Sequence, residues 1–194
     1  MRTRRNGAAI VVAAVVAGAT ALSLAGCVQP PPHVIPTSTS STAPVFASDA
    51  AALAAAKKAY VAYLAVSDQI LIDGGKDPKR LLTVATPAEL RNQMPGFEAE
   101  ATKHWRSTGG TRIDAISLQS FDQSTRGSQA IVTVYACIDV SGVDVLDQDG
   151  RSVVSSSRPK ASTFQATFDL ATHGPPQLMM ANEQPWQGKG ICPS

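Results

Sequence analysis

The stretch Ser128–Val140, SQAIVTVYACIDV, carries the strongest structural pattern in the chain. Its residues alternate between a wholly apolar set and a mixed set, and a period of two residues is typical of a β-strand with one buried face. The stretch therefore predicts a strand that packs its apolar face on the core. The apolar set is Ala130, Val132, Val134, Ala136, Ile138 and Val140, and the mixed set is Ile131, Thr133, Tyr135, Cys137 and Asp139.

Further strands are expected on both sides of this one. Arg112–Leu118 is compatible with a strand before it, and Phe164–Leu170 alternates apolar and polar residues after it. Gln177–Gln184 is expected to be the last strand, followed by a glycine-rich tail. The segments between the strands predict turns at Ser124–Gly127, Asp147–Gly150 and His173–Pro176 and a loop at Ser155–Lys160.

The chain before the strands predicts helices. Ser48 and Asp49 form a helix start, and no proline or glycine follows until Gly74-Gly75 ends the segment. Apolar residues recur at steps of three and four, which indicates a helix of about 25 residues with one buried stripe. The predicted stripe is Leu53, Ala56, Tyr60, Tyr63 with Leu64, Ser67, and Ile70 with Leu71.

Two shorter helices are expected next. Asp77-Pro78 starts a short one, and Thr86–Glu89, TPAE, is a capping box with proline at the first helical position. The helix begun there should continue to Gly109-Gly110, with an interruption or kink at Pro95-Gly96. Helices followed by antiparallel strands indicate an α+β domain with helices on one face of a sheet.

The first 27 residues predict export. Three arginines are followed by the apolar run Ala8–Ala21 and by Leu24–Cys27, LAGC, which is the order of a signal peptide with its cleavage site. An uncleaved membrane helix and an ordinary secretory peptide are the alternatives, since Ala8–Gly26 has nearly the ~20 residues that span a bilayer. All three place the rest of the chain outside the cytoplasm.

Leu24–Cys27 resembles the lipobox of bacterial lipoproteins at all four positions. The resemblance implies lipid on the Cys27 sulfur, cleavage before it, and retention on the outer face of the bacterial plasma membrane. It implies three parts: a signal peptide at 1–26, a lipidated cysteine with a tether at 27–47, and a single domain at 48–194. The tether is rich in proline, serine and threonine, a composition that does not support a packed core; the Thr37–Thr42 run is a site where sugars could be attached.

Charge and cysteine content limit the function classes. The whole chain has 17 Lys and Arg and 15 Asp and Glu. Three arginines lie in the signal peptide, so 14 basic and 15 acidic residues follow it, and no basic stripe indicates nucleic-acid binding. With Cys27 lipidated, Cys137 and Cys192 remain as a pair that should oxidise outside the cytoplasm. Two buried free cysteines are the alternative.

The order of the elements resembles the cone-shaped nuclear-transport-factor-two-like fold, in which N-terminal helices pack on a curved sheet. The resemblance rests on that order, on the strand with Tyr135-Ala136-Cys137, and on the late Trp186 with Cys192. A cystatin-like fold is close to it, and many small exported actinobacterial lipoproteins of unknown role are similar. The resemblance implies a domain that can enclose a pocket, with Cys192 tied to the mixed face of the strand.

No motif for a nucleophile, phosphate loop or metal site is present, so we assign no catalytic residue, metal or cofactor. His104 is expected at a helix surface and His173 in a turn. Asp144, Asp147 and Asp149 are spaced like calcium ligands but lack the distal glutamate, which favours a hairpin turn.

Polar and aromatic residues beside the apolar faces define a predicted pocket. Enzymes of the resembled fold, such as ketosteroid isomerase, use an acid with a tyrosine or second acid, although no motif matches residue by residue. Our main hypothesis is therefore a non-catalytic domain that binds a small ligand or another envelope protein. A pocket isomerase or hydrolase and a structural partner in an envelope complex are the alternatives. The predicted pocket residues are Tyr60, Tyr63, Asp68, Trp105, Tyr135 and Asp139.

Overall fold

The computed structural model describes residues 45–122, 131–172 and 177–193. The leader, Cys27, most of the tether and the predicted turns at Ser124–Gly127 and His173–Pro176 lie outside the described residues. The fold below is that of the unit 42–194. Within its described part, no helix combines the length and the apolarity needed to cross a bilayer.

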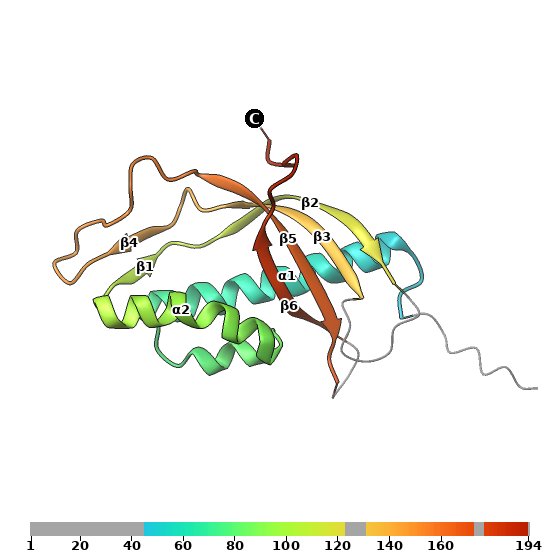
Figure 1. The fold of residues 1–194 in the computed structure, drawn as a ribbon, viewed down its shortest axis with the longest axis horizontal. Helices are drawn as coiled ribbons and strands as arrows, with labels where there is room; N and C mark the ends of the chain where they lie inside the picture. Colours follow the sequence, from blue (N-terminus) through green and yellow to red (C-terminus); the bar gives the residue numbers. More distant parts are fainter. Residues whose placement is uncertain (1–44, 123–130, 173–176, 194) are drawn as a thin grey trace, which may run out of the picture. The chain divides into compact units, whose positions relative to one another are not determined.

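Helices precede an antiparallel sheet, which confirms the α+β class (Figure 1). Four strands pair in the order β2-β3-β5-β6, and β1 pairs with β4 in a separate two-stranded sheet. The helix α1 crosses one face of the larger sheet, as Figure 1 shows. The elements are α1 Asp49–Ile72, the 3-10 helix η1 Pro78–Thr83, α2 Pro87–Lys103, β1 Arg106–Thr108, β2 Arg112–Phe121, β3 Val132–Asp139, β4 Asp144–Leu146, β5 Ala161–Leu170 and β6 Leu178–Pro185.

The predicted central pattern forms β3, which lies between β2 and β5. Val134 of β3 pairs with Leu118 on one side and with Ala166 on the other. Val132, Val134 and Ala136 have no exposed surface, because their side chains face the core beneath α1. The alternation in the sequence therefore identified both the strand and its buried face.

The long helix α1 begins and ends at the residues that the sequence indicated. The Ser48 hydroxyl accepts a hydrogen bond from the Ala51 amide. The chain then leaves the helix through two glycines with positive φ, and the Gly75 amide donates to the Ile70 carbonyl over 2.8 Å. Its buried residues are Ala52, Ala56, Tyr60, Tyr63, Leu64 and Ile70, which agree with most of the predicted stripe.

The helix α2 departs from the prediction in two ways. It is not interrupted at Pro95, which lies inside the 17-residue helix, because a proline removes only one backbone hydrogen bond. It then ends at Lys103 and not at Gly109-Gly110: His104 takes a left-handed conformation, and the Trp105 amide bonds the Glu100 carbonyl. The next residues form β1, whose pairing with β4 spans nearly 40 positions and left no local signal.

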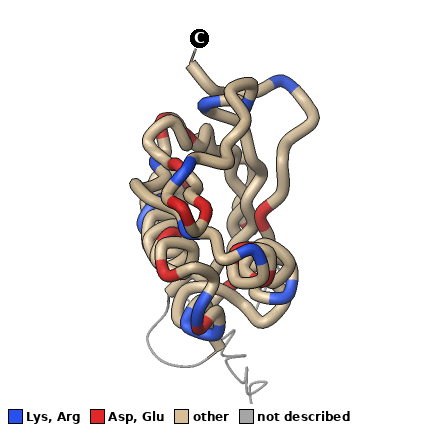
Figure 2. The backbone as a smooth tube through the Cα atoms, turned by 90° about the vertical axis from the view of Figure 1, so that its left-hand side faces the viewer, with Lys and Arg blue, Asp and Glu red and all other residues tan. Residues whose placement is uncertain are grey.

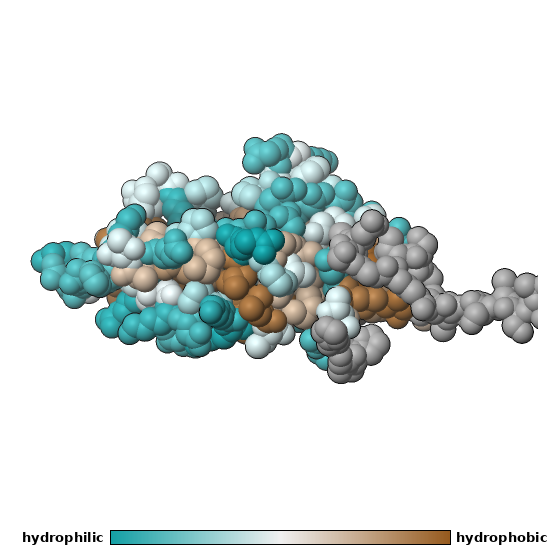
Figure 3. Space-filling view, turned by 60° about the horizontal axis from the view of Figure 1, so that its bottom comes forward, coloured by the Kyte–Doolittle hydropathy of each residue, from teal (hydrophilic) through white to brown (hydrophobic). Residues whose placement is uncertain are grey.

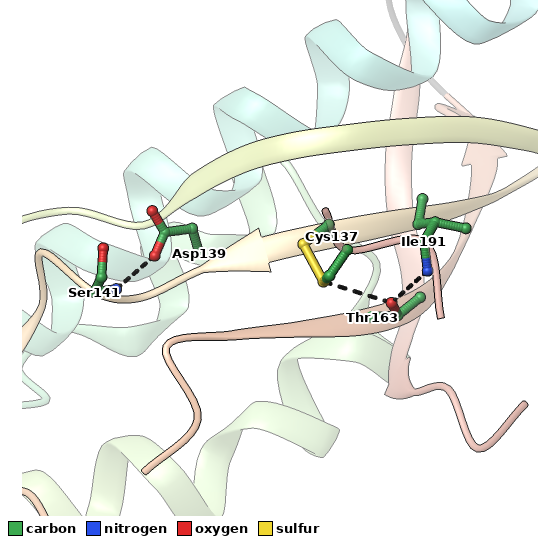
Figure 4. Close-up of a disulfide and its surroundings, with 6 residues drawn as sticks. Cys137, Asp139, Ser141, Thr163 and Ile191 are labelled. Atoms are coloured by element: carbon green, nitrogen blue, oxygen red, sulfur yellow. Dashed lines mark hydrogen bonds between the residues drawn. A yellow bond between two sulfur atoms is a disulfide. The ribbon is translucent and has the colours of Figure 1, made fainter. Parts of the chain in front are cut away.

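The C-terminal tail crosses the other face of the sheet and is fixed there by a disulfide. Cys137 and Cys192 are bonded, with Cα atoms 4.8 Å apart, as predicted. Thr163 of the neighbouring strand accepts a hydrogen bond from the Ile191 amide (Figure 4). At the start of the tail, the Trp186 ring lies 4.6 Å from the Tyr135 ring, centroid to centroid. The tail therefore shields the mixed face of β3.

Candidate functional site

Two buried tyrosines of α1 meet the buried Glu89 and the half-buried Glu183. Tyr60 and Tyr63 are three residues apart on α1, which places both phenols on its buried face. Glu89 lies in the first turn of α2 and is fully buried, and Glu183 belongs to β6. We refer to these four residues as the Tyr–Glu cluster; it joins α1, α2 and β6.

Both carboxylate oxygens of Glu89 and Oε1 of Glu183 accept hydrogen bonds. Tyr60 donates to Oε1 of Glu183, and Tyr63 donates to Oε1 of Glu89 over 2.8 Å and lies 3.4 Å from Oε2 of Glu183. The Glu183 amide donates to Oε2 of Glu89 over 3.3 Å. The side-chain amides of two α2 residues also donate to Glu89: Gln93 to Oε1 over 2.7 Å and Asn92 to Oε2 over 3.3 Å.

Burial shifts the proton equilibria of the cluster. It raises the pKa of Glu183 to about 7, and the nearby Glu89 carboxylate adds to the rise while the hydrogen bonds from the two tyrosines oppose it. Burial and the same two carboxylates raise the pKa of both Tyr60 and Tyr63. The described residues place no cation in an ion pair with Glu89 or Glu183. Glu183 can therefore hold a proton near neutral pH.

The sequence pattern predicts the two tyrosines of this cluster as pocket residues, but not its two glutamates. Glu89 was interpreted as the acid of a capping box; the Thr86 hydroxyl does accept from the Glu89 amide, but the Glu89 side chain turns inward to Tyr63. The Thr86 amide bonds the Met180 carbonyl of β6 instead. Glu183 carried no signal, because an acid near the end of a strand resembles a solvent-facing residue.

The two predicted pocket aspartates anchor the backbone. Asp68 accepts hydrogen bonds from the amide and hydroxyl of Thr111, which fixes the chain before β2 to α1. Asp139 pairs with Arg112 on β2 and accepts from the Ser141 amide over 2.7 Å (Figure 4). The Ser141 amide and the Arg112 guanidinium hold the pKa of Asp139 below its usual range. Neither aspartate contacts the Tyr–Glu cluster.

The remaining predicted pocket residues lie elsewhere. Trp105 is half-buried at the end of α2, where the Lys103 ammonium sits 4.1 Å above its ring. Tyr135 packs on the tail at Trp186. The six residues are therefore distributed over separate parts of the domain, and among them only Tyr60 and Tyr63 share a site.

Charged residues form local pairs. Figure 2 shows Lys and Arg interspersed with Asp and Glu along the described backbone. Asp147 accepts from the Asp149 and Arg151 amides in the predicted turn, and Asp144 accepts from the Ser152 hydroxyl. Within the described ranges no group of three or more His, Cys, Asp or Glu side chains is arranged to hold a metal ion.

Open grooves lie along both sides of the exposed face of α1. The first has a volume of about 330 Å³, close to the lower end of the range of small-molecule sites. The second, of about 340 Å³, lies between α1 and the start of β2. The first groove is lined by Val45, Phe46, Ala55, Lys58, Ala59, Ala62, Thr83, Val84, Gln177 and Leu178, and the second by Lys57, Val61, Leu64, Ala65, Asp68, Thr111, Arg112 and Ile113.

No protein-family model matches the sequence, and no curated protein is significantly similar to it.

Proposed function

We propose that the protein is an extracytoplasmic lipoprotein, anchored through lipid on Cys27, whose domain binds a small ligand or an envelope protein without catalysing a reaction. The observation that carries the proposal is the Cys137–Cys192 disulfide. Disulfides persist in oxidising compartments and are rare in the cytosol. The bond therefore agrees with export, which the leader and its cleavage site predict independently.

The geometry of the polar residues favours binding over catalysis. An acid–base site needs a group that can reach a reacting atom about 3 Å away. In the Tyr–Glu cluster both oxygens of Glu89 and Oε1 of Glu183 are engaged by donors of the domain itself. The first groove beside α1 is lined mainly by alanine, valine, leucine and phenylalanine, which suits contact with apolar surface.

Mass spectrometry of the protein from the membrane fraction tests the anchor. We expect a chain that begins at Cys27 and carries a diacylglyceryl group, and we expect Cys27→Ser to abolish both the lipid and the cleavage before residue 27. Cys192→Ser is the matched control, because it replaces a cysteine in the domain and should keep the lipid. An intact leader or an unmodified sulfur at residue 27 would overturn the proposal.

A further inference from the structure

The helix α1 is apolar on two opposite faces. It has only four charged residues among 24, namely Asp49, Lys57, Lys58 and Asp68. A helix at the surface of a domain normally turns a polar face to solvent. In α1 the outward stripe, at steps of three and four, is Ala54, Lys58, Val61 and Ala65, all of them exposed. Val61, the largest apolar residue of this stripe, has 52% of its surface exposed.

The two grooves beside α1 extend this stripe into a wider surface. Ala59 and Ala62 belong to the first groove and Val61 and Ala65 to the second. Figure 3 shows apolar areas on the side of the domain that it presents, including one beside the grey residues. Lys58 is the charged residue among those that line the first groove, which contains no acid. The second groove has Lys57, Arg112 and one acid, Asp68, whose carboxylate accepts hydrogen bonds from Thr111. We call the stripe and its two grooves the α1 face.

The point where the tether reaches the domain lies on the same surface. Val45 and Phe46, the first described residues, line the first groove, and α1 begins three residues after Phe46. The segment between Cys27 and Val45 has 17 residues, enough to reach about 50 Å in a proline-rich extended form. A lipid at Cys27 therefore leaves the α1 face within reach of the bilayer.

We propose that the α1 face docks on an anionic lipid surface. The inference rests on the proposed lipid anchor. Lys57 and Lys58 stand among small apolar residues, so their stems can lie along the surface while the ammonium groups reach lipid phosphates. Each lysine near an anionic bilayer contributes about fivefold to binding. Two lysines would bind a free domain to the bilayer only weakly. The tether holds the domain at a high effective concentration beside the bilayer, so these contacts are enough to dock it.

Docking in this orientation would present the opposite side of the sheet to other molecules. The tail with Trp186 lies on that side, packed on Tyr135 of β3. A partner in the envelope would then meet the tail and β2–β3 surface, while the lysines of α1 contact lipid.

The experiment uses the lipidated protein reconstituted in vesicles of phosphatidylglycerol or of phosphatidylcholine. An environment-sensitive fluorophore is attached to a cysteine introduced as Ala62→Cys on the α1 face, or as Ser156→Cys in the exposed loop before β5. We expect blue-shifted emission and quenching by brominated lipid at position 62 in anionic vesicles only, no response at position 156, and loss of the response at high salt.

A charge reversal provides the second measurement. Lys57→Glu with Lys58→Glu should lower the ratio of docked to undocked protein by at least about 25-fold. Lys160→Glu with Lys189→Glu, two exposed lysines outside the α1 face, is the matched control and should change it little. Circular dichroism of each variant checks that the domain is folded.

The outcomes separate the two proposals. If the protein floats with vesicles but position 62 responds equally in both lipids, the α1 face does not recognise anionic headgroups and the inference is wrong. A response that appears only as protein density rises means that the α1 face binds a second copy, which also overturns the inference. A protein that floats while position 62 stays in water also overturns the inference and leaves the anchor standing. Failure to float overturns the anchor itself.

Discussion

The amide of Glu183 on β6 donates a hydrogen bond to the carboxylate of Glu89 on α2, 94 residues earlier in the chain. Tyr63 of α1 joins the pair, since its hydroxyl lies 2.8 Å from Glu89 and 3.4 Å from Glu183. Two carboxylates this close would repel each other if both were ionised. Burial and the nearby Glu89 carboxylate raise the pKa of Glu183 to about 7, which gives this junction of three elements a pH dependence that a neutral core would lack.

We expect the free energy of unfolding to fall as pH rises from about 4.5 to about 7 and to level off above. The pKa of Glu183 rises from 4.5 to about 7 on folding, so in this window the folded state binds more protons than the unfolded state. The stabilisation is fully present below the unfolded-state pKa of 4.5 and is lost as pH rises through the folded-state pKa of about 7. Its size is about 3 kcal/mol at most. Urea titrations between pH 4 and 8 measure it.

Glu183→Gln should remove most of this slope and make the protein more stable than the wild type at pH 8, because an amide does not ionise. Glu98→Gln, at an exposed position of α2, is the matched control and should reproduce the wild-type slope. A Glu183→Gln profile that still falls between pH 4.5 and 7 would assign the dependence to another group.

Tyr63→Phe should destabilise the domain by about 1–3 kcal/mol, because it removes the donor to a buried acceptor and leaves the ring in place. Tyr135→Phe is the control: its ring packs on Trp186, and its hydroxyl makes no hydrogen bond within the described residues. Equilibrium unfolding of the two variants measures the difference. Equal losses would show that the Tyr63–Glu89 bond adds nothing to stability.

Sequence patterns predicted the elements that have a local cause. The alternation around Val134 gave β3, and Ser48 with Gly75 bounded α1, because each pattern lies within the element that it describes. The same reasoning placed the disulfide, since two cysteines remain once Cys27 is set aside. The α+β class followed from the order of the elements.

The candidate site could not be predicted in the same way, because its contacts join distant segments. Glu183 reaches Tyr60 across 123 positions, and an acid in a strand carries no mark of burial. Asp68 and Asp139 were both expected at a pocket, and Asp68 does line the second groove. Each also holds a backbone amide, and such an aspartate has the same local sequence as one that faces a ligand. The strands β1 and β4 have three residues each, too few for a periodic pattern.

Reduction of the disulfide should lower the free energy of unfolding by about 2–5 kcal/mol, because it frees a loop whose ends are 55 residues apart. The tail should also leave the sheet, so that Trp186 loses contact with Tyr135. Denaturation with and without reductant, followed by tryptophan emission, measures both effects. Because Trp105 also emits, Trp105→Phe protein should be used. An unchanged emission on reduction would mean that the tail is held without the disulfide.

Gly75→Ala should be far more costly than Gly150→Ala, although both glycines have a positive φ, of 75° and 78°. The shared conformation costs an alanine about 1–2 kcal/mol at either position. At Gly75 a Cβ would also lie 2.1 Å from the Phe97 carbonyl oxygen, whereas at Gly150 no atom lies within 4 Å. Gly75 is thus where α1 ends against α2, and the added methyl group must push the two helices apart. We expect Gly150→Ala to lose about 1 kcal/mol and Gly75→Ala at least ~3 kcal/mol by urea denaturation. Equal losses would mean that the contact between the two helices adapts without cost.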